Sequence, residues 1–574
     1  MNARFAGSRD RLDPRLLLAV GGVALAAWAA FSASGYELRV LTLAGIYTIL
    51  VLGYQLVFGH AGALSLAQGA FFGIGGYVTG ILATRWGWPF PATFALSLAA
   101  PALLALLVAL PVLRLQSHYF ALATLAIAQT VLLVAVNRVD LTGGANGLYG
   151  VPGIAAFGVQ VPAGLPLLAF VWACAGLAMA ACWLATRGRR RTAYAMLRDA
   201  PLAAAASGLD LGRLRTQAFV LGAALAGAAG ALHVHTLRVV SPEILAFDTM
   251  VLCLTMTVIG GRLRLAGAVL GALLLTHLPE WFRALEQYYL IATGAILLGA
   301  VLFAPNGLAA LLPARRRTPP PVAPPAAPTA RRVPPAALGI AGLTRTYGGV
   351  RAVDGVDVAL GNGEIVGLIG ANGSGKTTLA NLVTGFAAPD AGTVAWNGAE
   401  IGGLPPHRIA RAGIARSFQQ PDLPAALTVA EAVAVALPPD APDTAADALL
   451  AELGLADLAQ TLCGSLPHGV RRHADIARAL AGDPGLLVLD EPAAGLTEAE
   501  AAALAAILRR RADGGLAILV IEHDTAFLAP LADRLVCLAA GRVIAAGPTA
   551  AVLTEPAVRD AWLGDAAAIP GADP

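Results

Sequence analysis

The stretch GANGSGKTTL, Gly370–Leu379, contains Lys376, the only lysine in the 574 residues of this chain. Arginine occupies every other lysine-or-arginine position. Lysine presents a compact charge on a flexible stem, whereas arginine presents a bulkier planar guanidinium with five donors. A position that keeps lysine in such a chain therefore requires a small cation that can thread through a narrow backbone loop.

The residues around Lys376 match a phosphate-binding loop. The apolar run EIVGLIG ends at Gly370, and Gly370-x4-Gly375-Lys376-Thr377 fits the pattern G-x-x-x-x-G-K-[ST] in the required order of strand, loop and helix. In such a loop, backbone N–H groups and a helix N-terminus converge on phosphate oxygens, and the lysine reaches the β- and γ-phosphates. We expect phosphate-binding roles for Gly370, Asn372, Gly373, Ser374, Gly375, Lys376, Thr377 and Thr378.

Composition places much of the chain in a lipid bilayer. Hydrophobic residues make up 57% of the chain and charged residues 13%, against about 25% charged in soluble proteins. Apolar runs recur near the roughly 20 residues that a helix needs to cross a bilayer. Ten runs predict a polytopic all-α membrane domain, near residues 16–34, 39–57, 63–84, 92–113, 119–137, 164–185, 215–234, 249–261, 265–279 and 288–311. The eighth and ninth runs are short and also fit a single re-entrant unit.

The placement of arginine predicts the orientation of these runs. With ten spans, the arginine-rich segments at the N-terminus and near residues 114, 186, 260 and 314 fall on one side, which the positive-inside rule makes the cytoplasm. The N-terminus and everything after residue 313 are then cytoplasmic. The first run lacks a clear cleavage site followed by polar sequence, so we expect it to be retained as a span.

Two further features narrow the functional class. The net charge of +3 is too small to suggest nucleic acid as a partner. The five cysteines are scattered without a C-x-x-C pair, which argues against a metal site built on them and against a disulfide framework.

The chain changes character after its membrane domain, residues 1–313. Proline and arginine dominate residues 314–337, which favours an extended, semi-rigid linker; a proline-rich ligand for a recognition domain is the alternative. Residues 338–566 alternate short apolar runs such as GLLVLD and LAILVIEH with alanine-rich stretches, a pattern typical of an α/β domain with a mostly parallel sheet. Residues 567–574 form a tail.

Two acids end one of these apolar runs. In LLVLDEP, Asp490 and Glu491 follow a strand-like segment downstream of the phosphate-binding loop. An aspartate there can hold Mg²⁺ together with Thr377, and the next carboxylate can polarise an attacking water. Without a phosphate-binding loop upstream, a solvated turn or a helix cap would be the better interpretation of two adjacent acids.

The order and spacing of the motifs across this domain resemble the ATP-binding subunit of an ABC transporter. The resemblance is carried by Tyr347, the phosphate-binding loop, RSFQQ, LPHGVRRHADIARAL, LLVLDEPAAGL and VIEHD. It implies ATP and Mg²⁺ as cofactors, with Tyr347 stacked on adenine, Gln419 at the γ-phosphate and metal, Glu491 as general base, and His523 aligning the base with the γ-phosphate. Gly469 would belong to the element that closes over the nucleotide of a second subunit.

One element departs from the family pattern. The sequence L-S-G-G-Q, usual in the family, is Leu466-Pro467-His468-Gly469-Val470 here, so the serine hydroxyl and the glutamine are absent. The helical continuation ADIARAL is intact. Two interpretations stay open: weakened but competent chemistry at both nucleotide sites, or one impaired site of two.

The membrane half resembles the permease of branched-chain amino-acid importers. FGHAGALSLAQGAFFGIGGYVTG, LTGGANGLYGVPG and the segment Ser241–Leu275 carry this resemblance. It implies a fused permease and ATPase in the bacterial cytoplasmic (inner) membrane that imports branched-chain or other hydrophobic amino acids. A second permease and a second ATPase, or a second copy of the chain, would complete the assembly with an extracytoplasmic solute-binding protein, for which Leu141–Gly153 is a candidate docking surface.

Features of the permease half have competing interpretations. Gly69-x3-Gly73 and Gly76-x3-Gly80 indicate close helix packing rather than substrate contact. Gln68, Gln129 and Asn137 either line a path or hydrogen-bond neighbouring helices. The segment Leu197–Arg215 is a candidate coupling helix, a short alanine-rich helix between two spans that would transmit motion of the ATPase; an ordinary connecting helix is the alternative.

The sequence leaves other functions open. The same family architecture serves urea and short amides. An ATP-driven exporter would usually show about six spans with long helical extensions, which the short loops of this chain disfavour. A regulatory ATP-binding membrane protein that does not transport is disfavoured by the presence of Lys376, Asp490, Glu491 and His523.

Overall fold

The computed structural model describes residues 34–113, 117–156, 158–281, 337–438, 440–442 and 444–560, with short pieces between 288 and 311. The chain forms two compact units, each described by itself below. The first comprises residues 1–190 and 212–318, and the second comprises residues 191–211 and 319–574. The segment 191–211 lies between two long helices of the first unit in sequence, yet it packs with the second unit.

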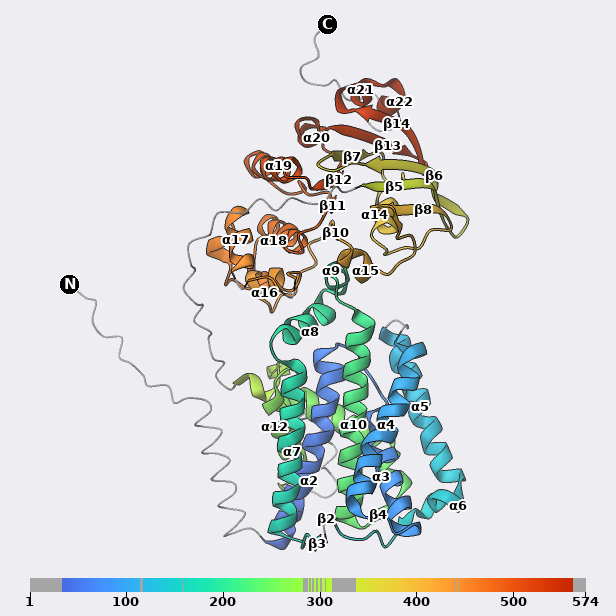
Figure 1. The fold of residues 1–574 in the computed structure, drawn as a ribbon. Helices are drawn as coiled ribbons and strands as arrows, with labels where there is room; N and C mark the ends of the chain where they lie inside the picture. The colour runs from blue at the N-terminus through green and yellow to red at the C-terminus, as the bar shows by residue number, and fades with distance from the viewer. Residues whose placement is uncertain are drawn as a thin grey trace, which may run out of the picture. The chain divides into compact units, whose positions relative to one another are not determined.

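The first unit is built from helices (Figure 1). Its helices are α2 (Gly35–Tyr54), the π-helical η1 (Gln55–His60), α3 (Gln68–Arg85), α4 (Phe90–Val112), α5 (Ser117–Asn137), α6 (Val139–Thr142), η2 (Gly144–Asn146), α7 (Leu165–Thr186), α10 (Leu211–Leu237), η3 (Pro242–Leu245), α11 (Phe247–Gly260), α12 (Leu265–Trp281) and η5 (Leu308–Leu311). Short strands join them: β1 (Leu148–Tyr149) with β4 (Val239–Val240), and β2 (Ala155–Ala156) with β3 (Val159–Gln160).

Helices occupy eight of the ten apolar runs expected from the sequence, and α11 and α12 are separate helices. Among the described residues, five helices are long and apolar enough to cross a membrane: Gly35–His60, Phe90–Ala109, His118–Asn137, Leu165–Thr186 and Leu211–Leu237. The run at 16–34 lies outside the described residues, except for Ser34, and that at 288–311 is described only in pieces. The number of spans therefore stays a prediction.

Close backbone contacts hold the helices of this unit together. A Cβ atom at Gly222 of α10 would lie 2.7 Å from the carbonyl oxygen of Gly53 on α2, so only glycine permits this approach. Buried Gln68 donates to the carbonyl oxygens of Leu50 and Gly222, at 3.3 and 3.1 Å. Gln68 thus hydrogen-bonds neighbouring helices, as one of the two sequence interpretations expects. Asn137 instead donates to Leu133 of its own helix, and Gln129 is exposed.

The second unit is an α/β domain. Its strands are β5 (Leu338–Tyr347), β6 (Val350–Leu360), β7 (Ile365–Ile369), β8 (Ala391–Trp396), β9 (Ala399–Glu400), β10 (Ile414–Arg416), β11 (Leu486–Asp490), β12 (Ala517–Ile521), β13 (Arg534–Ala539) and β14 (Arg542–Pro548). One sheet has the order β10-β11-β12-β7-β13-β14, parallel except for β14, and an antiparallel sheet has the order β6-β5-β8-β9.

The helices of this unit are α14 (Lys376–Val383), α15 (Pro406–Arg411), α16 (Val429–Ala434), α17 (Ala445–Glu452), η6 (Ala456–Leu458), η7 (Cys463–Ser465), α18 (His468–Leu480), α19 (Glu498–Asp513), α20 (Thr525–Leu531), α21 (Thr549–Thr554) and α22 (Pro556–Val558). Alternation along β7 sends Ile365 and Ile369 into one apolar cluster, and Val366 and Leu368 into another on the opposite face. Every residue of β7, β11 and β12 is buried, as expected for central parallel strands.

Two helices precede α10 in sequence: α8 (Arg189–Asp199) and α9 (Pro201–Ala206). The expected single helix over Leu197–Arg215 is therefore divided into the end of α8, the short α9 and the start of α10. Alanines of α9 share an apolar cluster with Phe418 and Leu427 of the α/β domain. The predicted linker, residues 314–337, lies outside the described residues except for Ala337, as does the tail.

Candidate nucleotide-binding and coupling site

The loop between β7 and α14 is shaped to surround an anion. At Gly375, φ is +107° and an added Cβ atom would lie 2.2 Å from the carbonyl oxygen of Ala352, so this position requires glycine. The ammonium of Lys376 donates to the carbonyl oxygens of Gly370 and Ala371, at 2.7 and 2.8 Å. The hydroxyl oxygen of Ser374 is buried and has no hydrogen-bond partner among the described residues. An unsatisfied hydroxyl beside a folded-back ammonium suits a loop that receives phosphate.

Three strands bring the predicted site residues to one edge of the sheet. Strands β11 and β12 pair in parallel with Asp490 opposite Ile521, and Ile521 pairs in turn with Leu368 of β7. The carboxyl ends of parallel strands in register lie side by side. Glu491, His523 and the phosphate-binding loop therefore share this edge.

Glu491 is the centre of the arrangement. Its backbone has φ of +51°, the left-handed region that a non-glycine residue rarely adopts. The side-chain amide of Gln419 donates to its Oε2 atom at 2.9 Å, and the Nδ1 atom of His523 lies 4.0 Å from its Oε1 atom. The three residues expected to be catalytic thus meet at one carboxylate, which lies where a water near a γ-phosphate could be activated.

Asp490 lies deeper than Glu491. Its carboxylate is 3.3 Å from the guanidinium of Arg416, which also donates to Asn381 and Thr384. Burial raises the pKa of Asp490, and the charge of Arg416 acts in the opposite direction. Burial likewise lowers the pKa of Lys376, against the nearby charges of Glu491 and Asp490.

The oxygen donors here suit Mg²⁺. The carboxylate of Asp490 is buried, and the exposed hydroxyl of Thr377, at the second position of α14, makes no hydrogen bond to any described residue. Carboxylate and hydroxyl oxygens are the ligands that this ion prefers beside nucleotide phosphates. The side chain of Gln419 is engaged with Glu491, so its role as a metal ligand stays a prediction.

The remaining predicted residues lie around this edge. Tyr347 ends β5, is 45% exposed, and has the guanidinium of Arg345 at 4.8 Å from its ring centroid. Asn372, Gly373 and Thr378 lie in or just after the phosphate-binding loop. Gly469, near the start of α18, has Leu496 and Gly495 as neighbours rather than this loop.

Sequence reasoning missed a set of buried charges behind the site. Glu522 is 1% exposed and accepts hydrogen bonds from the backbone N–H groups of Ala493 and His523, at 2.8 and 3.1 Å. Burial raises its pKa. Arg472 is equally buried and donates to the carbonyl oxygens of Phe418 and Asp490. Glu522 stands in the quoted VIEHD motif, but the sequence alone could not show that its side chain is enclosed.

Arg478 is completely buried and joins α18 to the segment 191–211. It donates to Asp475 at 2.9 Å, to the backbone oxygen of Arg416 at 2.8 Å and to the hydroxyl of Ser207 at 2.8 Å. The sequence does contain an indication of this ion pair: Asp475 and Arg478 are three residues apart on a predicted helix, and residues at this spacing lie side by side on the helix surface.

Two further hydrogen bonds fasten this segment. Asp422, three residues after Gln419, accepts from the backbone N–H of Ala203 at 3.2 Å, and Arg411 donates to the carbonyl oxygen of Gly208 at 2.9 Å. Burial raises the pKa of Asp422. The segment therefore contacts the elements on either side of Gln419 and the helix that carries Gly469.

Comparison with known families matches both parts of the chain. Residues 36–304 match the family described as "Branched-chain amino acid transport system / permease component", and residues 353–494 match the ABC transporter family. The "High-affinity branched-chain amino acid transport ATP-binding protein BraF" of Pseudomonas aeruginosa is 35% identical over 250 residues, which are 40% of this chain and 98% of that protein. The chain is an ABC transporter with fused permease and ATPase domains.

This transporter has other relatives of the same kind. The protein LivG of Escherichia coli, named as a high-affinity branched-chain amino acid transport ATP-binding protein, is 35% identical over 251 residues, covering 40% of the transporter and 98% of LivG. The crystal structure of a nucleotide-free ATP-binding cassette from an ABC transporter is 28% identical, with a TM-score of 0.37, over 40% of the transporter and all of that chain.

Membership of this family assigns a general function to each unit of the chain. The α/β domain is an ABC ATPase, so it binds nucleotide and couples ATP hydrolysis to transport, and the helical unit is a membrane permease. Transporters of this family work as dimeric assemblies, which agrees with the position of Gly469 away from the phosphate-binding loop of its own chain. The predicted fusion of a permease with an ATPase is thereby confirmed.

Proposed function

We propose that this ABC transporter imports branched-chain amino acids, or other amino acids with apolar side chains, across the bacterial cytoplasmic (inner) membrane. The observation that carries the proposal is the match of residues 36–304 to permease components of branched-chain amino-acid transport, joined in one chain to an ABC ATPase in which Gln419 contacts Glu491 near the loop that holds Lys376. In this proposal the permease occupies residues 1–313, the linker 314–337 and the ATPase 338–566, followed by the tail 567–574. The N-terminus and the ATPase are cytoplasmic.

Hydrolysis in this proposal proceeds at the edge of the parallel sheet. Lys376 and the loop from Gly370 hold the phosphates of ATP, and Tyr347 stacks on adenine. Glu491 accepts the proton of the attacking water, oriented by the side chains of Gln419 and His523. Thr377, Asp490 and Gln419 would hold Mg²⁺, which neutralises charge on the phosphates.

Coupling to transport follows from the contacts of the segment 191–211. This segment is continuous in sequence with the membrane helices α7 and α10, and it is fastened to the ATPase by Asp422, Arg411 and Arg478. A ligand shifts a conformational equilibrium only as far as its contacts differ between the two states. We assign that differential contact to the stretch 419–422, in which Gln419 donates to Glu491 and Asp422 accepts from the backbone of Ala203 in α9.

Each ATPase requires a second one to close its nucleotide site. In this proposal a second ATPase and a second permease, from another chain or from a copy of this one, complete the transporter. Pro467 and His468 take the places of the serine and the first glycine in the family sequence L-S-G-G-Q. His468 is also the first residue of α18, and in this proposal the N-terminus of α18 faces the nucleotide bound by the partner ATPase. An extracytoplasmic solute-binding protein would dock on Leu141–Gly153, where the ring of Tyr149 is 72% exposed.

The test is energised uptake of labelled leucine, with labelled urea in parallel, by cells that carry the transporter with its neighbouring components. Glu491→Gln should reduce ATP hydrolysis and leucine uptake about 100-fold or more, because the general base is lost. Glu498→Gln is the matched control, since this exposed glutamate lies in the first turn of α19 outside the site.

The outcomes separate the alternatives. Leucine uptake that depends on Glu491 supports the proposal. Glu491-dependent uptake of urea alone would retain the mechanism and replace the substrate class. Export of leucine, or uptake indifferent to Glu491, would overturn the proposal.

A further inference from the structure

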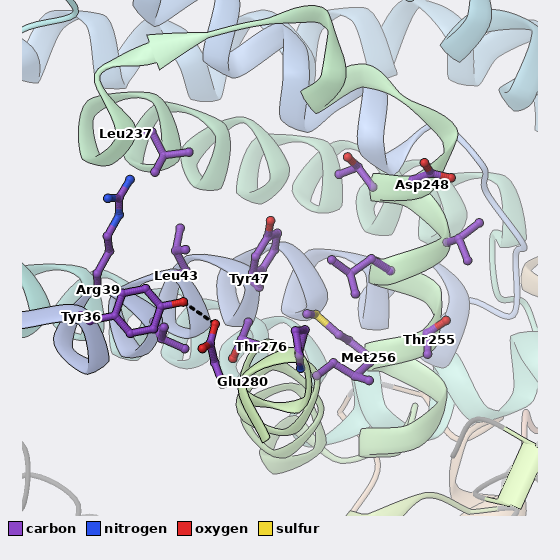
Figure 2. Close-up of a pocket in the computed structure, with 16 residues that line it drawn as sticks. Tyr36, Arg39, Leu43, Tyr47, Leu237, Asp248, Thr255, Met256, Thr276 and Glu280 are labelled. Carbon is purple, nitrogen blue, oxygen red and sulfur yellow. Dashed lines mark hydrogen bonds between the residues drawn. The ribbon is translucent and has the colours of Figure 1, made fainter. Parts of the chain in front are cut away.

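The permease unit contains a cavity of about 890 Å³ among α2, the end of α10, α11 and α12 (Figure 2). This volume lies within the roughly 300–1,000 Å³ typical of small-molecule sites. Nothing in the ATPase mechanism uses these residues.

Regular helical faces build the cavity wall. On α2 the lining positions recur every three or four residues, as one face of a helix requires. They are Tyr36, Arg39, Val40, Leu43 and Tyr47. Helix α11 contributes Val251, Leu252 and Met256, and α12 contributes Leu275. Most of the wall surface is therefore apolar.

Charged side chains of both signs line the cavity near the ends of these helices. Arg39 lies in the second turn of α2, Asp248 is the second residue of α11, and Glu280 lies in the last turn of α12. Figure 2 shows Arg39 and Glu280 on the same side of the cavity, with the hydroxyl of Tyr36 hydrogen-bonded to Glu280. Charged residues at membrane helices are costly and usually mark a pathway or a ligand.

We propose that this cavity is a transit site for a zwitterionic amino acid with an aliphatic side chain. Arg39 pairs with the α-carboxylate, Glu280 accepts the α-ammonium, and Leu43, Leu252 and Met256 surround the side chain. A zwitterion needs both charges close together beside an apolar wall, whereas urea or a simple amide needs neither charge. The inference rests on the proposed import of amino acids and locates their passage through the permease.

The test measures whether leucine protects an introduced cysteine thiol in the cavity from chemical labelling. Val251→Cys, at a cavity position that is 40% exposed, is placed in a Cys174→Ser background, because the other four cysteines are buried. The full transporter with its partner subunits, in lipid nanodiscs without solute-binding protein, is labelled with a small thiosulfonate reagent. Leucine up to about 10 mM, enough for a Kd near 1 mM, should slow labelling.

Analogues and a control position define what is recognised. Leucinamide, which lacks the carboxylate, and 4-methylpentanoate, which lacks the ammonium, should need about tenfold higher concentration for equal protection. Leu177→Cys, on an exposed position of α7 outside the cavity, should be labelled at a rate that leucine does not change. Arg39→Ala and Glu280→Gln should each weaken protection by leucine about tenfold, and Arg39→Lys should restore part of it.

The outcomes of this test are independent of the uptake test. No protection by leucine at Val251→Cys, and again none at Leu43→Cys, overturns the inference even where uptake depends on Glu491. Equal protection by leucine and both analogues also overturns it, because the cavity then recognises only apolar bulk. Protection with the expected analogue pattern but no Glu491-dependent import would leave the cavity assignment standing and reject the proposed function.

Discussion

The permease and the ATPase enclose polar side chains in different ways. Among the described residues, the buried polar side chains of the permease unit are hydroxyls, amides and histidines, such as Thr48, Gln55 and Gln68. In the ATPase unit the largest fully buried side chains are Arg472 and Arg478. Every buried Asp, Glu or Arg in the described chain lies in this second unit.

The contrast follows from the partners that each unit provides for its buried polar side chains. The buried amides of the permease donate to backbone carbonyls of neighbouring segments. Gln55 donates to Gly261 and Arg264 in the turn between α11 and α12, and Gln68 donates to Leu50 of α2 and Gly222 of α10. The ATPase unit brings Asp490 and Glu491 to the end of the buried strand β11, and Arg416, near Asp490, provides compensating charge. Neutral groups therefore fasten the permease, and mutually dependent charges organise the ATPase.

The largest effect is expected from Arg478→Met. This change leaves the buried carboxylate of Asp475 without its cationic partner, at a cost of about 3–5 kcal/mol. The unfolding transition of the ATPase in the full transporter should fall by on the order of 10 °C. Arg509→Met is the control, because its ion pairs with Asp513 and Asp533 are partly exposed and worth about 1 kcal/mol or less. Equal decreases in the unfolding temperature of the two variants would contradict the expected difference between buried and exposed ion pairs.

A smaller loss is expected from Gly222→Ala in the permease. The added methyl would approach the carbonyl oxygen of Gly53, and overpacking of this kind costs about 1–3 kcal/mol. Gly176→Ala on α7 is the matched control, because nothing lies within 4 Å of the added methyl group. Thermal aggregation of the full transporter in detergent should worsen for the first variant and not for the second. The close α2–α10 contact would be refuted by identical behaviour.

The Gln68→Leu variant probes the neutral hydrogen bonds themselves. Loss of two donations to carbonyl oxygens inside the helix bundle should cost about 0.6–2 kcal/mol. Gln129→Leu, on an exposed face of α5, should cost nothing by the same aggregation assay. A decrease in stability for Gln68→Leu as large as that for Arg478→Met would contradict the expectation that neutral hydrogen bonds in the permease contribute less than buried charges in the ATPase.

The smallest effect concerns pH. Burial raises the pKa of Glu522, so the folded protein binds its proton more tightly than the unfolded chain. The contribution of this group to stability is present at low pH and lost as pH rises through its folded-state pKa. Between pH 8 and pH 5, the melting temperature of the ATPase in the wild type should therefore rise relative to that of Glu522→Gln. A difference that is independent of pH would show that Glu522 does not titrate in this range.

The residues proposed for the hydrolytic site could be named from the sequence because each belongs to a local motif. Strand β7, the glycine loop and α14 follow one another without interruption. Asp490 ends β11, Glu491 follows it, and His523 lies two residues after the end of β12. Parallel pairing then brings these strand ends together. Arg416, Arg472 and Glu522 were not predictable in the same way, because a charged letter in a sequence does not reveal whether its side chain is enclosed.

By itself, the sequence determined that an apolar helical half is joined to an α/β ATPase and that Lys376 stands in a glycine-rich loop between a strand and a helix, since hydropathy, strand periodicity and the glycine loop are local properties. Only the tertiary structure decided that the segment 191–211 packs with the ATPase, that Arg478 reaches Ser207, and that Arg39 and Glu280 share one cavity. These relations join residues about 200 or more positions apart, and no local pattern encodes which distant side chain completes a buried charge.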